Sequence, residues 1–257
     1  MTKYIRREVF PMPELSRRVQ TFTDSVIRRM TRINDMTPGS INLSQGFPDF
    51  DPPKEILEAL KAAAEHGPHQ YSITFGAKNF RDALADMYTK EWNRPIDPDK
   101  EIVVTCGGTE AMMAAMMTVC NPGDKVAVFS PFYENYGADA ILSGADPIYI
   151  PLVPPDFYYD RAVLEQAFRD GAKALILCNP SNPCGKVFTM GEMEEIAELA
   201  KRYDAFVITD EVYEYIIYDG NRHISMAALP GMYERTITCS SLSKTYSMTG
   251  WRLGYLI

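Results

Sequence analysis

Residues 241–255 read Ser-Leu-Ser-Lys-Thr-Tyr-Ser-Met-Thr-Gly-Trp-Arg-Leu-Gly-Tyr, and this stretch decides how the rest of the chain is interpreted. Lys244 places a potentially nucleophilic amine among hydroxyl groups, and a lysine that reacts with a carbonyl needs the low pKa that apolar or cationic surroundings provide. Ser241, Ser243 and Arg252 offer the hydroxyl donors and the guanidinium fork that a phosphate needs. The stretch could therefore hold both ends of an aldehyde-bearing phosphate. Because a single lysine is far more often a solvated surface residue, the interpretation depends on the rest of the chain.

The bulk composition is that of an ordinary globular protein. The chain has 257 residues, of which 46% are hydrophobic and 23% are charged, enough for a substantial core. The formal net charge of −8 argues against a general nucleic-acid or anionic-membrane surface. No apolar run is long enough to span a bilayer, and the first residues lack the apolar core of a secretory signal. We therefore expect a cytoplasmic protein with no nucleic-acid or membrane partner.

The cysteines and histidines suggest neither a disulfide framework nor a metal site. The five cysteines are an odd number and form no CxxC pair, which predicts a reduced protein without a zinc site. Cys106, Cys178 and Cys239 each end an apolar run and are interpreted as small buried hydrophobic residues. The three histidines form no ligand pattern. We predict that no metal is bound.

Regular α/β patterning begins at residue 102. Short apolar runs there are hydrophobic at successive rather than alternating positions, which is typical of strands buried on both faces of a mainly parallel sheet. The predicted strands are 102–105, 125–130, 147–150, 174–178, 206–209, 236–239 and 253–257, and the predicted helices between them are 109–120, 133–142, 160–169 and 189–203. The fold class is therefore α/β, with three α/β/α layers around a mainly parallel, seven-stranded sheet.

The first hundred residues have a different pattern. A helix with a basic outer face is predicted at 13–34, followed by a breaker at 37–40 and a loop rich in turn-forming residues. Two further helices are predicted at 53–65 and 77–92. The helix at 13–34 is interpreted as an N-terminal helical arm. At the other end, 253–257 reads as a buried strand with nothing after it to cover it, so we expect the sequence to be the front part of a longer protein.

Unusual polar and aromatic residues follow five of the predicted strands. Ligands of such sheets gather outside the carboxyl edge of the strands, so these five sets are expected to meet at one site. They are residues 107–109, 131–133, 179–185, 210–211 and 240–244. Residues 107–110 also open a helix, whose free N–H groups favour an anion. Taken alone, that stretch is better interpreted as a glycine turn with Thr109 as the helix cap.

The other sets also have a functional and a purely structural interpretation. Asn182 can donate to an oxyanion, and Pro183 restricts how it is presented. Asp210 ends a strand, where a carboxylate can hold a heterocyclic nitrogen protonated; alone, it is equally a helix cap. Tyr213 could turn its hydroxyl into the same cleft. Tyr133 is either a platform for a flat ring or a core aromatic.

Four segments in order resemble one family. They are Gly-Gly-Thr-Glu-Ala (107–111), Asn-Pro-Ser-Asn-Pro-Cys-Gly-Lys-Val (179–187), Thr-Asp-Glu-Val-Tyr (209–213) and residues 241–255. Together they resemble the class I and II aminotransferases of the aspartate aminotransferase fold, which use pyridoxal 5′-phosphate (PLP). The resemblance extends from about residue 40 to the end of the chain. It implies PLP as the cofactor and a homodimer as the assembly.

The resemblance implies a role for each matching residue. Lys244 corresponds to the Schiff-base lysine, Asp210 to the partner of the pyridine nitrogen, and Tyr213 to a third catalytic residue. The implied cofactor-binding residues are Gly108, Thr109, Tyr133, Asn182, Asp210, Tyr213, Ser241, Ser243, Lys244 and Arg252, together with Tyr71, which reaches the phosphate in the partner subunit. Gly46 and Asn182 are implied at the substrate.

The resemblance also implies a domain plan. Residues 1–45 would form the arm and part of a small domain, and residues 46–257 the PLP-binding large domain. The family continues beyond this point with the rest of the small domain, which carries the arginine that grips the substrate carboxylate. No residue of this chain corresponds to that arginine, so we expect at most trace transaminase activity from these 257 residues.

The implied reaction is transfer of an amino group between an L-amino acid and a 2-oxo acid by double displacement through Lys244. One alternative on the same fold is a β- or γ-eliminating lyase, for example one that breaks C–S bonds. Another is a non-catalytic PLP-binding module, as in regulators that carry a DNA-binding head. The acidic charge disfavours that module, and no helix-turn-helix pattern precedes residue 40.

Overall fold

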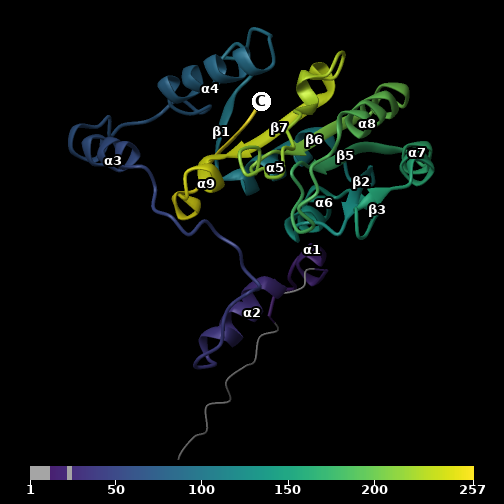
Figure 1. Cartoon of the computed structure of the whole chain (residues 1–257), viewed down its shortest axis with the longest axis horizontal. Helices are drawn as coiled ribbons and strands as arrows, with labels where there is room; N and C mark the ends of the chain where they lie inside the picture. Colours follow the sequence, from purple (N-terminus) through teal and green to yellow (C-terminus); the bar gives the residue numbers. More distant parts are fainter. Residues whose placement is uncertain (1–11, 22–24) are drawn as a thin grey trace, which may run out of the picture.

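The computed structural model describes residues 12–21 and 25–257, and an eight-stranded sheet forms its centre (Figure 1). The strands are β1 (Val103–Cys106), β2 (Lys125–Ser130), β3 (Asp146–Val153), β4 (Tyr158–Tyr159), β5 (Ala172–Cys178), β6 (Phe206–Asp210), β7 (Thr236–Ser241) and β8 (Leu253–Leu256). Their order across the sheet is β1-β8-β7-β6-β5-β2-β3-β4. The predicted α/β class is therefore confirmed.

The sheet is parallel in its middle and antiparallel at its edges. β3, β2, β5, β6 and β7 pair in parallel, while β8 runs antiparallel to both β7 and β1. The prediction of seven strands missed β4, which pairs antiparallel with the end of β3. Two tyrosines are too short a run to show a strand period, and the pairing depends on the turn that precedes them.

Strand β5 shows how the layers are built. Leu175 and Leu177 pack on one face with Leu164 of α7 (Arg161–Arg169) and Ile196 of α8 (Met190–Arg202). Ile176, between them, packs on the other face with α5 (Gly108–Val119) and α6 (Asn135–Ser143). A strand covered on both faces has no polar face to alternate, which explains its continuous apolar run.

Local sequence sets the ends of several helices. Thr189 and Glu192 form a reciprocal capping box at the start of α8, which satisfies backbone N–H groups that the helix leaves free. Gly144 ends α6 in the left-handed conformation, which glycine adopts without steric cost. The methionines of α5 at positions 112 and 116 are core residues, as a flexible gap-filling side chain would be.

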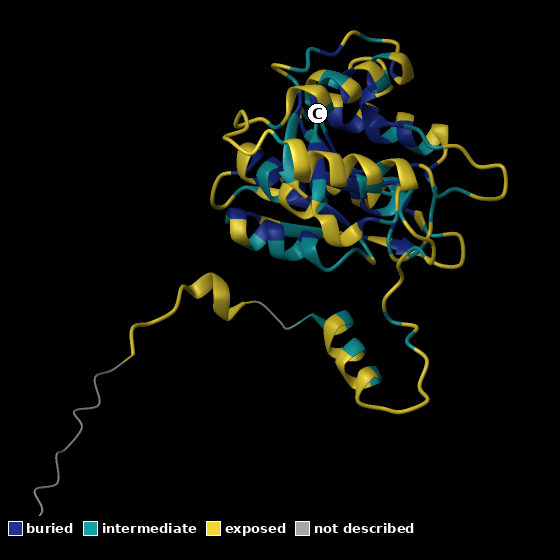
Figure 2. Cartoon of the chain, turned by 90° about the vertical axis from the view of Figure 1, so that its left-hand side faces the viewer, coloured by how far each residue is buried: buried dark blue, intermediate teal, exposed yellow. Residues whose placement is uncertain are grey.

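The N-terminal region is helical but not continuous. Instead of one helix over 13–34, the structure has α1 (Arg17–Gln20) and α2 (Val26–Asp35); residues 22–24, inside the predicted helix, are outside the described part. Ser25 caps α2 by accepting a hydrogen bond from the Arg28 N–H, so the hydroxyl competes with a through-going helix. Two further helices follow, α3 (Lys54–His66) and α4 (Lys78–Glu91). In Figure 2 most of α2 projects away from the body of the molecule, whereas Ser25, at its start, donates a hydrogen bond to the Glu134 carboxylate just before α6.

The cysteines are free thiols, but one lies elsewhere than predicted. Cys178 and Cys239 are buried, whereas Cys106 is exposed. It ends β1, the edge strand of the sheet, so no further strand covers that side. Among the described helices, none combines the length and apolarity needed to cross a membrane.

Candidate active site

Most of the predicted site residues meet at one edge of the sheet. Asp210 is the last residue of β6 and Ser241 the last of β7, so parallel pairing places both at the same edge. β8 runs the opposite way, and this brings Arg252, just before it, to that edge as well. The short helix α9 (Leu242–Thr245) follows β7 and carries Lys244.

Arg252 lies over the glycine turn that opens α5. A Cβ added to Gly107, whose φ is +81°, would lie 2.2 Å from Nη2 of Arg252, so no side chain fits between the turn and the guanidinium. A Cβ on Gly254 would lie 2.3 Å from the Gly107 carbonyl carbon. The Arg252 guanidinium donates to the Thr249 carbonyl at 3.0 Å and to the Cys106 carbonyl at 3.4 Å. The backbone of the turn therefore lies in direct contact with the Arg252 guanidinium and with Gly254, and only glycine fits at positions 107 and 254.

The same place has the composition of an anion site. Gly108 and Thr109 begin a twelve-residue helix, whose first N–H groups have no partner within the helix. A Cβ on Gly108 would lie 3.8 Å from Cβ of Ser241, so the serine adjoins the helix start. Ser241 is buried, and its Oγ accepts from the Ser243 N–H at 3.3 Å. Helix start, hydroxyl and guanidinium together suit a phosphate.

Asp210 is buried at the centre of the edge. Its Oδ2 accepts a 2.6 Å hydrogen bond from the Tyr136 hydroxyl, and its Oδ1 accepts from the Val212 N–H at 3.3 Å. Burial raises the pKa of Asp210, although both hydrogen bonds act in the opposite direction. A cation beside this carboxylate would favour its ionised form.

Lys244 and Tyr213 face the same space. Nζ of Lys244 lies 5.7 Å from the centre of the Tyr213 ring. Burial lowers the pKa of Lys244, and the negative charge of Asp210 opposes this only in part. The Asn182 side-chain amide donates to the Tyr213 hydroxyl at 3.2 Å. An amine with a lowered pKa, a hydroxyl and an amide are thus grouped together next to a buried carboxylate.

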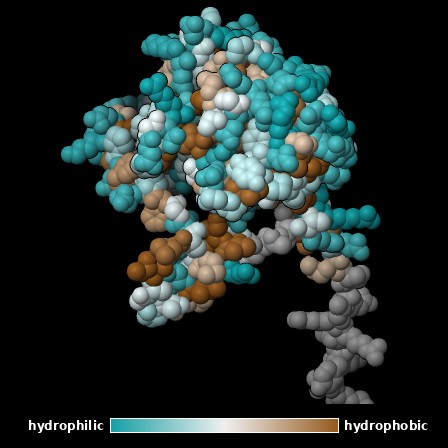
Figure 3. Space-filling model, turned by 45° about the vertical axis from the view of Figure 1, so that its right-hand side comes forward, coloured by the Kyte–Doolittle hydropathy of each residue, from teal (hydrophilic) through white to brown (hydrophobic). Residues whose placement is uncertain are grey.

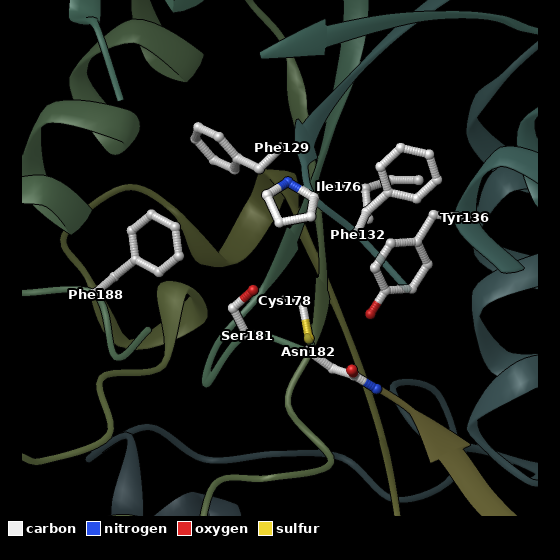
Figure 4. Close-up of a pocket in the computed structure, with 9 residues that line it drawn as sticks. Phe129, Phe132, Tyr136, Ile176, Cys178, Ser181, Asn182 and Phe188 are labelled. Atoms are coloured by element: carbon white, nitrogen blue, oxygen red, sulfur yellow. The ribbon is translucent and has the colours of Figure 1, made fainter. Parts of the chain in front are cut away.

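Tyr133 and Tyr136 line the rear of the site from the start of α6. The two rings pack edge to face, with centroids 5.8 Å apart. Tyr136 also lines a cavity of about 10 Å³, roughly the room for one water. In Figure 4, Phe129 and Phe188 lie on one side of this cavity, and the Tyr136 hydroxyl and Asn182 amide lie on the other. It is too small for a cofactor, so the candidate site is the open edge in front of it.

Two predicted residues are not brought to this edge. Tyr71 is fully exposed. Gly46 is exposed, and a Cβ built on it would meet no atom within 4 Å. Both belong to the N-terminal region, which contributes no buried residue among those described before Arg81. Their predicted roles at a phosphate in the partner subunit and at the substrate remain predictions.

Tyr136 is a residue of the site that the sequence did not single out. It is 2% exposed and makes the shortest hydrogen bond to Asp210. Its spacing was the available indication: it lies three residues after Tyr133 in a predicted helix, so the two share a face. A tyrosine in a helix is usually a core aromatic, and only the sheet order shows which strand end it reaches.

The donors of this edge fit PLP. The first N–H groups of α5, the Ser241 hydroxyl and the Arg252 guanidinium suit a phosphate, and the buried Asp210 carboxylate suits a protonated ring nitrogen. The Asn182–Tyr213 pair can donate to a ring oxygen, and Lys244 offers the amine for an aldehyde. Each group that the cofactor would need has a partner of matching chemistry.

Comparison with known proteins points the same way. The family described as "Aminotransferase class I and II" matches residues 38–257. Kynurenine–oxoglutarate transaminase 3 of Mus musculus is 41% identical over 231 residues, which cover 86% of this chain and 51% of the relative. Aromatic-amino-acid aminotransferase 2 of Thermococcus litoralis is 37% identical, over 94% of this chain and 62% of that protein.

A solved structure shares the fold over nearly the whole chain. N-succinyldiaminopimelate aminotransferase from Mycobacterium tuberculosis superposes with a TM-score of 0.89 at 36% identity, covering 95% of this chain and 64% of that one. The chain spans about half the length of the kynurenine–oxoglutarate transaminases that it matches.

Proposed function

We propose that this chain, which belongs to the class I and II aminotransferase family, carries the cofactor-binding part of an enzyme that transfers an amino group between an L-amino acid and a 2-oxo acid. The observation that carries the proposal is the convergence of Lys244, Asp210 and Arg252 at one strand edge. The family is PLP-dependent. Bound PLP supplies an aldehyde that takes up amines and a ring that withdraws electrons from the substrate Cα.

Each residue then has a defined task. Arg252, Ser241 and the first N–H groups of α5 hold the phosphate. Asp210 holds a proton at the ring nitrogen, and the Tyr136 hydrogen bond keeps its carboxylate in place. Lys244 is the proton carrier: because burial lowers the pKa of its amine, the neutral form that can accept a proton at Nζ is more accessible.

Asn182 and Tyr213 act as a pair. The amide donates to the phenol oxygen, which leaves the Tyr213 proton free to point at a cofactor oxygen in front of it. The Lys244 amine lies next to that ring. We infer that the pair orients the cofactor so that the lysine faces one side of the reacting carbon.

The remaining assignments concern the whole protein. We propose a cytoplasmic homodimer in amino acid metabolism, in which the exposed Tyr71 reaches the phosphate in the partner subunit and Gly46 lies near the substrate. Residues 1–45 are proposed as the arm with part of a small domain, and residues 46–257 as the large domain. The relatives are named for kynurenine, aromatic and succinyldiaminopimelate substrates, which makes amino acids with bulky side chains the first donors to test.

The test is covalent capture of PLP. The chain is incubated with PLP, treated with borohydride and digested, and the label is located by mass spectrometry. We expect it at Lys244 in the unchanged chain and its loss in Lys244→Ala. Lys173→Ala is the matched control, because Lys173 is also partly buried and pairs with Asp124 at the opposite end of the sheet. Equal labelling of unchanged chain and Lys244→Ala would refute the assignment.

A donor panel then separates the reaction types. Transamination converts an amino acid and a 2-oxo acid into their counterparts, whereas an eliminating lyase releases ammonia and pyruvate from a β-substituted donor. We expect exchange of amino groups without ammonia, and at most trace turnover by the 257 residues alone. Ammonia release would favour the lyase.

A further inference from the structure

The segment after β6 presents two faces. Asp210 and Tyr213 point to the candidate site, whereas Glu211 and Glu214, next to them in sequence, are buried on the other side at 1% and 7% exposure. Backbone hydrogen bonds hold the segment: the Glu211 N–H donates to the Cys239 carbonyl at 2.9 Å, and the Glu214 N–H to the Glu211 carbonyl at 3.0 Å. The contacts of Glu211 and Glu214 therefore help to position Asp210 and Tyr213.

Glu211 contacts a buried histidine. Its Oε2 lies 2.8 Å from Nε2 of His223, whose side chain is 8% exposed, and its Oε1 accepts from the Ser225 hydroxyl at 3.2 Å. This ties the segment to the loop before the 3₁₀ turn at Met226–Ala228.

Glu214 contacts one of the other two site-bearing segments directly and reaches the second through Tyr88 of α4. Its Oε1 accepts from the Ser240 hydroxyl at 3.4 Å and the Tyr88 hydroxyl at 3.3 Å. The Tyr88 hydroxyl is 2.8 Å from that of Tyr255. Ser240 directly precedes Ser241, and Tyr255 follows Arg252 by three residues. One buried network thus touches the backs of all three segments that face the proposed cofactor.

The network requires a particular number of protons. It holds two carboxyl groups and one imidazole, and a buried unpaired charge is costly. Burial lowers the pKa of His223, but the hydrogen bond and charge of Glu211, together with the charges of Glu214 and Glu91, raise it by more. Burial, together with the charge of Glu211, raises the pKa of Glu214 to about 8. The cluster is neutral overall when the direct Glu211–His223 contact is an ion pair and Glu214 keeps its proton.

Other ionisable groups face Glu214. Glu91 of α4 adds negative charge, and burial also raises its pKa. Tyr215 and Tyr255 face it from its own segment and from β8, and they are neutral at physiological pH because burial raises the pKa of both. The positive charge of His223 acts in the opposite direction and lowers the pKa of Glu214. Loss of the Glu214 proton would therefore leave an excess negative charge within the network.

We propose that Glu211, His223 and Glu214 are positioning residues for the cofactor site: their buried contacts hold the three site-bearing segments together, and loss of these contacts loosens the segments and weakens PLP binding. Ionisation of Glu214 in mildly alkaline solution is one way to disturb them. The binding part rests on the proposed function. The same three residues are also close enough to ligate a metal ion. The direct Glu211–His223 contact and the hydrogen bonds that Glu214 accepts from Tyr88 and Ser240 already give these side chains partners, which a metal ion would have to displace.

The experiment compares Glu214→Gln and His223→Gln with the unchanged chain. The dissociation constant of PLP is measured from its absorbance between pH 6.5 and 9.5, and amide exchange of segments 210–216 and 240–246 is measured without PLP, corrected for intrinsic rates. His66→Gln is the control, because His66 and Glu65 form a fully exposed pair.

From pH 7 to pH 9 we expect the PLP affinity of the unchanged chain to fall about threefold to tenfold more than that of Glu214→Gln. This is the size of a typical long-range coupling. Glu214→Gln, which cannot ionise, should lack that extra loss. His223→Gln should weaken binding at every pH and increase exchange in both segments. His66→Gln should match the unchanged chain.

The outcomes separate the two proposals. If the unchanged chain does not bind PLP at any pH, the proposed function fails, and the exchange data still test the network. If it binds PLP, but Glu214→Gln keeps the full pH dependence and neither variant changes exchange, the network proposal is wrong. Equimolar Zn²⁺ binding that is lost in His223→Gln would also overturn it in favour of a metal site.

Discussion

The sheet region and the N-terminal region of this chain bury their apolar side chains very differently. From Arg81 onward the structure has three buried clusters, whereas none of the described residues before Arg81 is buried. Apolar side chains nevertheless gather in the N-terminal part, where α2 and the chain after it form the lobe that appears largely brown in Figure 3. Met30, Ile33, Ile41 and Leu43 line a groove of about 520 Å³ there.

The difference shows which information the chain contains. The central strands of the sheet are apolar on both faces, and helices of this same chain cover both faces. The sheet region therefore buries its own apolar side chains. The apolar face of α2 has the spacing of an amphipathic helix, but within residues 12–21 and 25–257 no element covers it. Stability should therefore come from the sheet region, with little contribution from the arm. Four changes test this comparison.

The largest effect is expected from truncating a core side chain of β5. Leu175 is fully buried between β5, α7 and α8, and Leu→Ala at such a site leaves a cavity that costs about 2–5 kcal/mol. Leu175→Ala should lower the free energy of unfolding by this amount in urea titrations. A loss below about 1 kcal/mol would mean that the sheet is not where the stability lies.

The second change separates binding from stability inside the sheet region. Asp210→Asn keeps the shape but removes the negative charge, and a hydrogen bond to a charged group contributes about 1.5–3 kcal/mol. We therefore expect PLP affinity to fall by one to two orders of magnitude, with the free energy of unfolding of the PLP-free chain unchanged or increased. Tyr136→Phe, which removes the hydroxyl that donates to Asp210, should weaken binding less. Unchanged affinity in Asp210→Asn would break the link between this carboxylate and the ring nitrogen.

Much of the fold was readable from sequence because its strands are doubly buried. Predicted helices such as 160–169 and 189–203 agree with α7 and α8 to within a residue or so, because each has a capping residue at its start. The strand at Tyr158–Tyr159 was not predicted, because its pairing with β3 depends on a chain reversal and not on a local period. The break between α1 and α2 was missed because helical spacing continues across it.

The site was less fully predictable. Residues that follow strand ends could be grouped, because parallel strands end at a common edge. The positions of Tyr136 and of the Glu211–His223 contact could not be predicted in this way, because they depend on which helix or loop packs against which strand. The sequence predicted that Arg252 binds a phosphate, but it did not reveal that β8 is antiparallel to β7, which is why Arg252 lies at this edge of the sheet. The predicted roles of Tyr71 and Gly46 are not tested by the structure of the sheet, because both residues lie in the region before Arg81, where no described residue is buried.

The third change concerns a buried carboxyl group that has no evident role in binding. Asp139 of α6 is 3% exposed, and its Oδ2 has no hydrogen-bond partner in the described part of the chain. Burial, aided by the charge of Asp210, raises the pKa of Asp139 to about 7. The folded chain therefore binds a proton that the unfolded chain releases near pH 4, so this group makes stability fall as pH rises from about 4 to about 7.

Asp139→Asn removes that titration. Relative to the unchanged chain, we expect no gain in the free energy of unfolding at pH 4 and a gain on the order of 1 kcal/mol at pH 7.5. Urea titrations at the two pH values measure it, with Asp146→Asn as the control, because Asp146 is exposed at the start of β3. A gain that is the same at both pH values would show that Asp139 does not titrate as described.

The smallest effect on the free energy of unfolding is expected in the arm, and this prediction tests the comparison most directly. Ile41 and Leu43 are 82% and 92% exposed, so replacing each with serine removes almost no burial, and such surface changes stay within about 0.5 kcal/mol. Ile41→Ser with Leu43→Ser should therefore leave the urea midpoint of the chain unchanged, whereas Leu164→Ser in α7, which is fully buried, should lower it. If the arm variant lost more than about 1 kcal/mol, its apolar face would be packed on the sheet in solution. The contrast between a self-covered sheet and an uncovered arm would then be wrong.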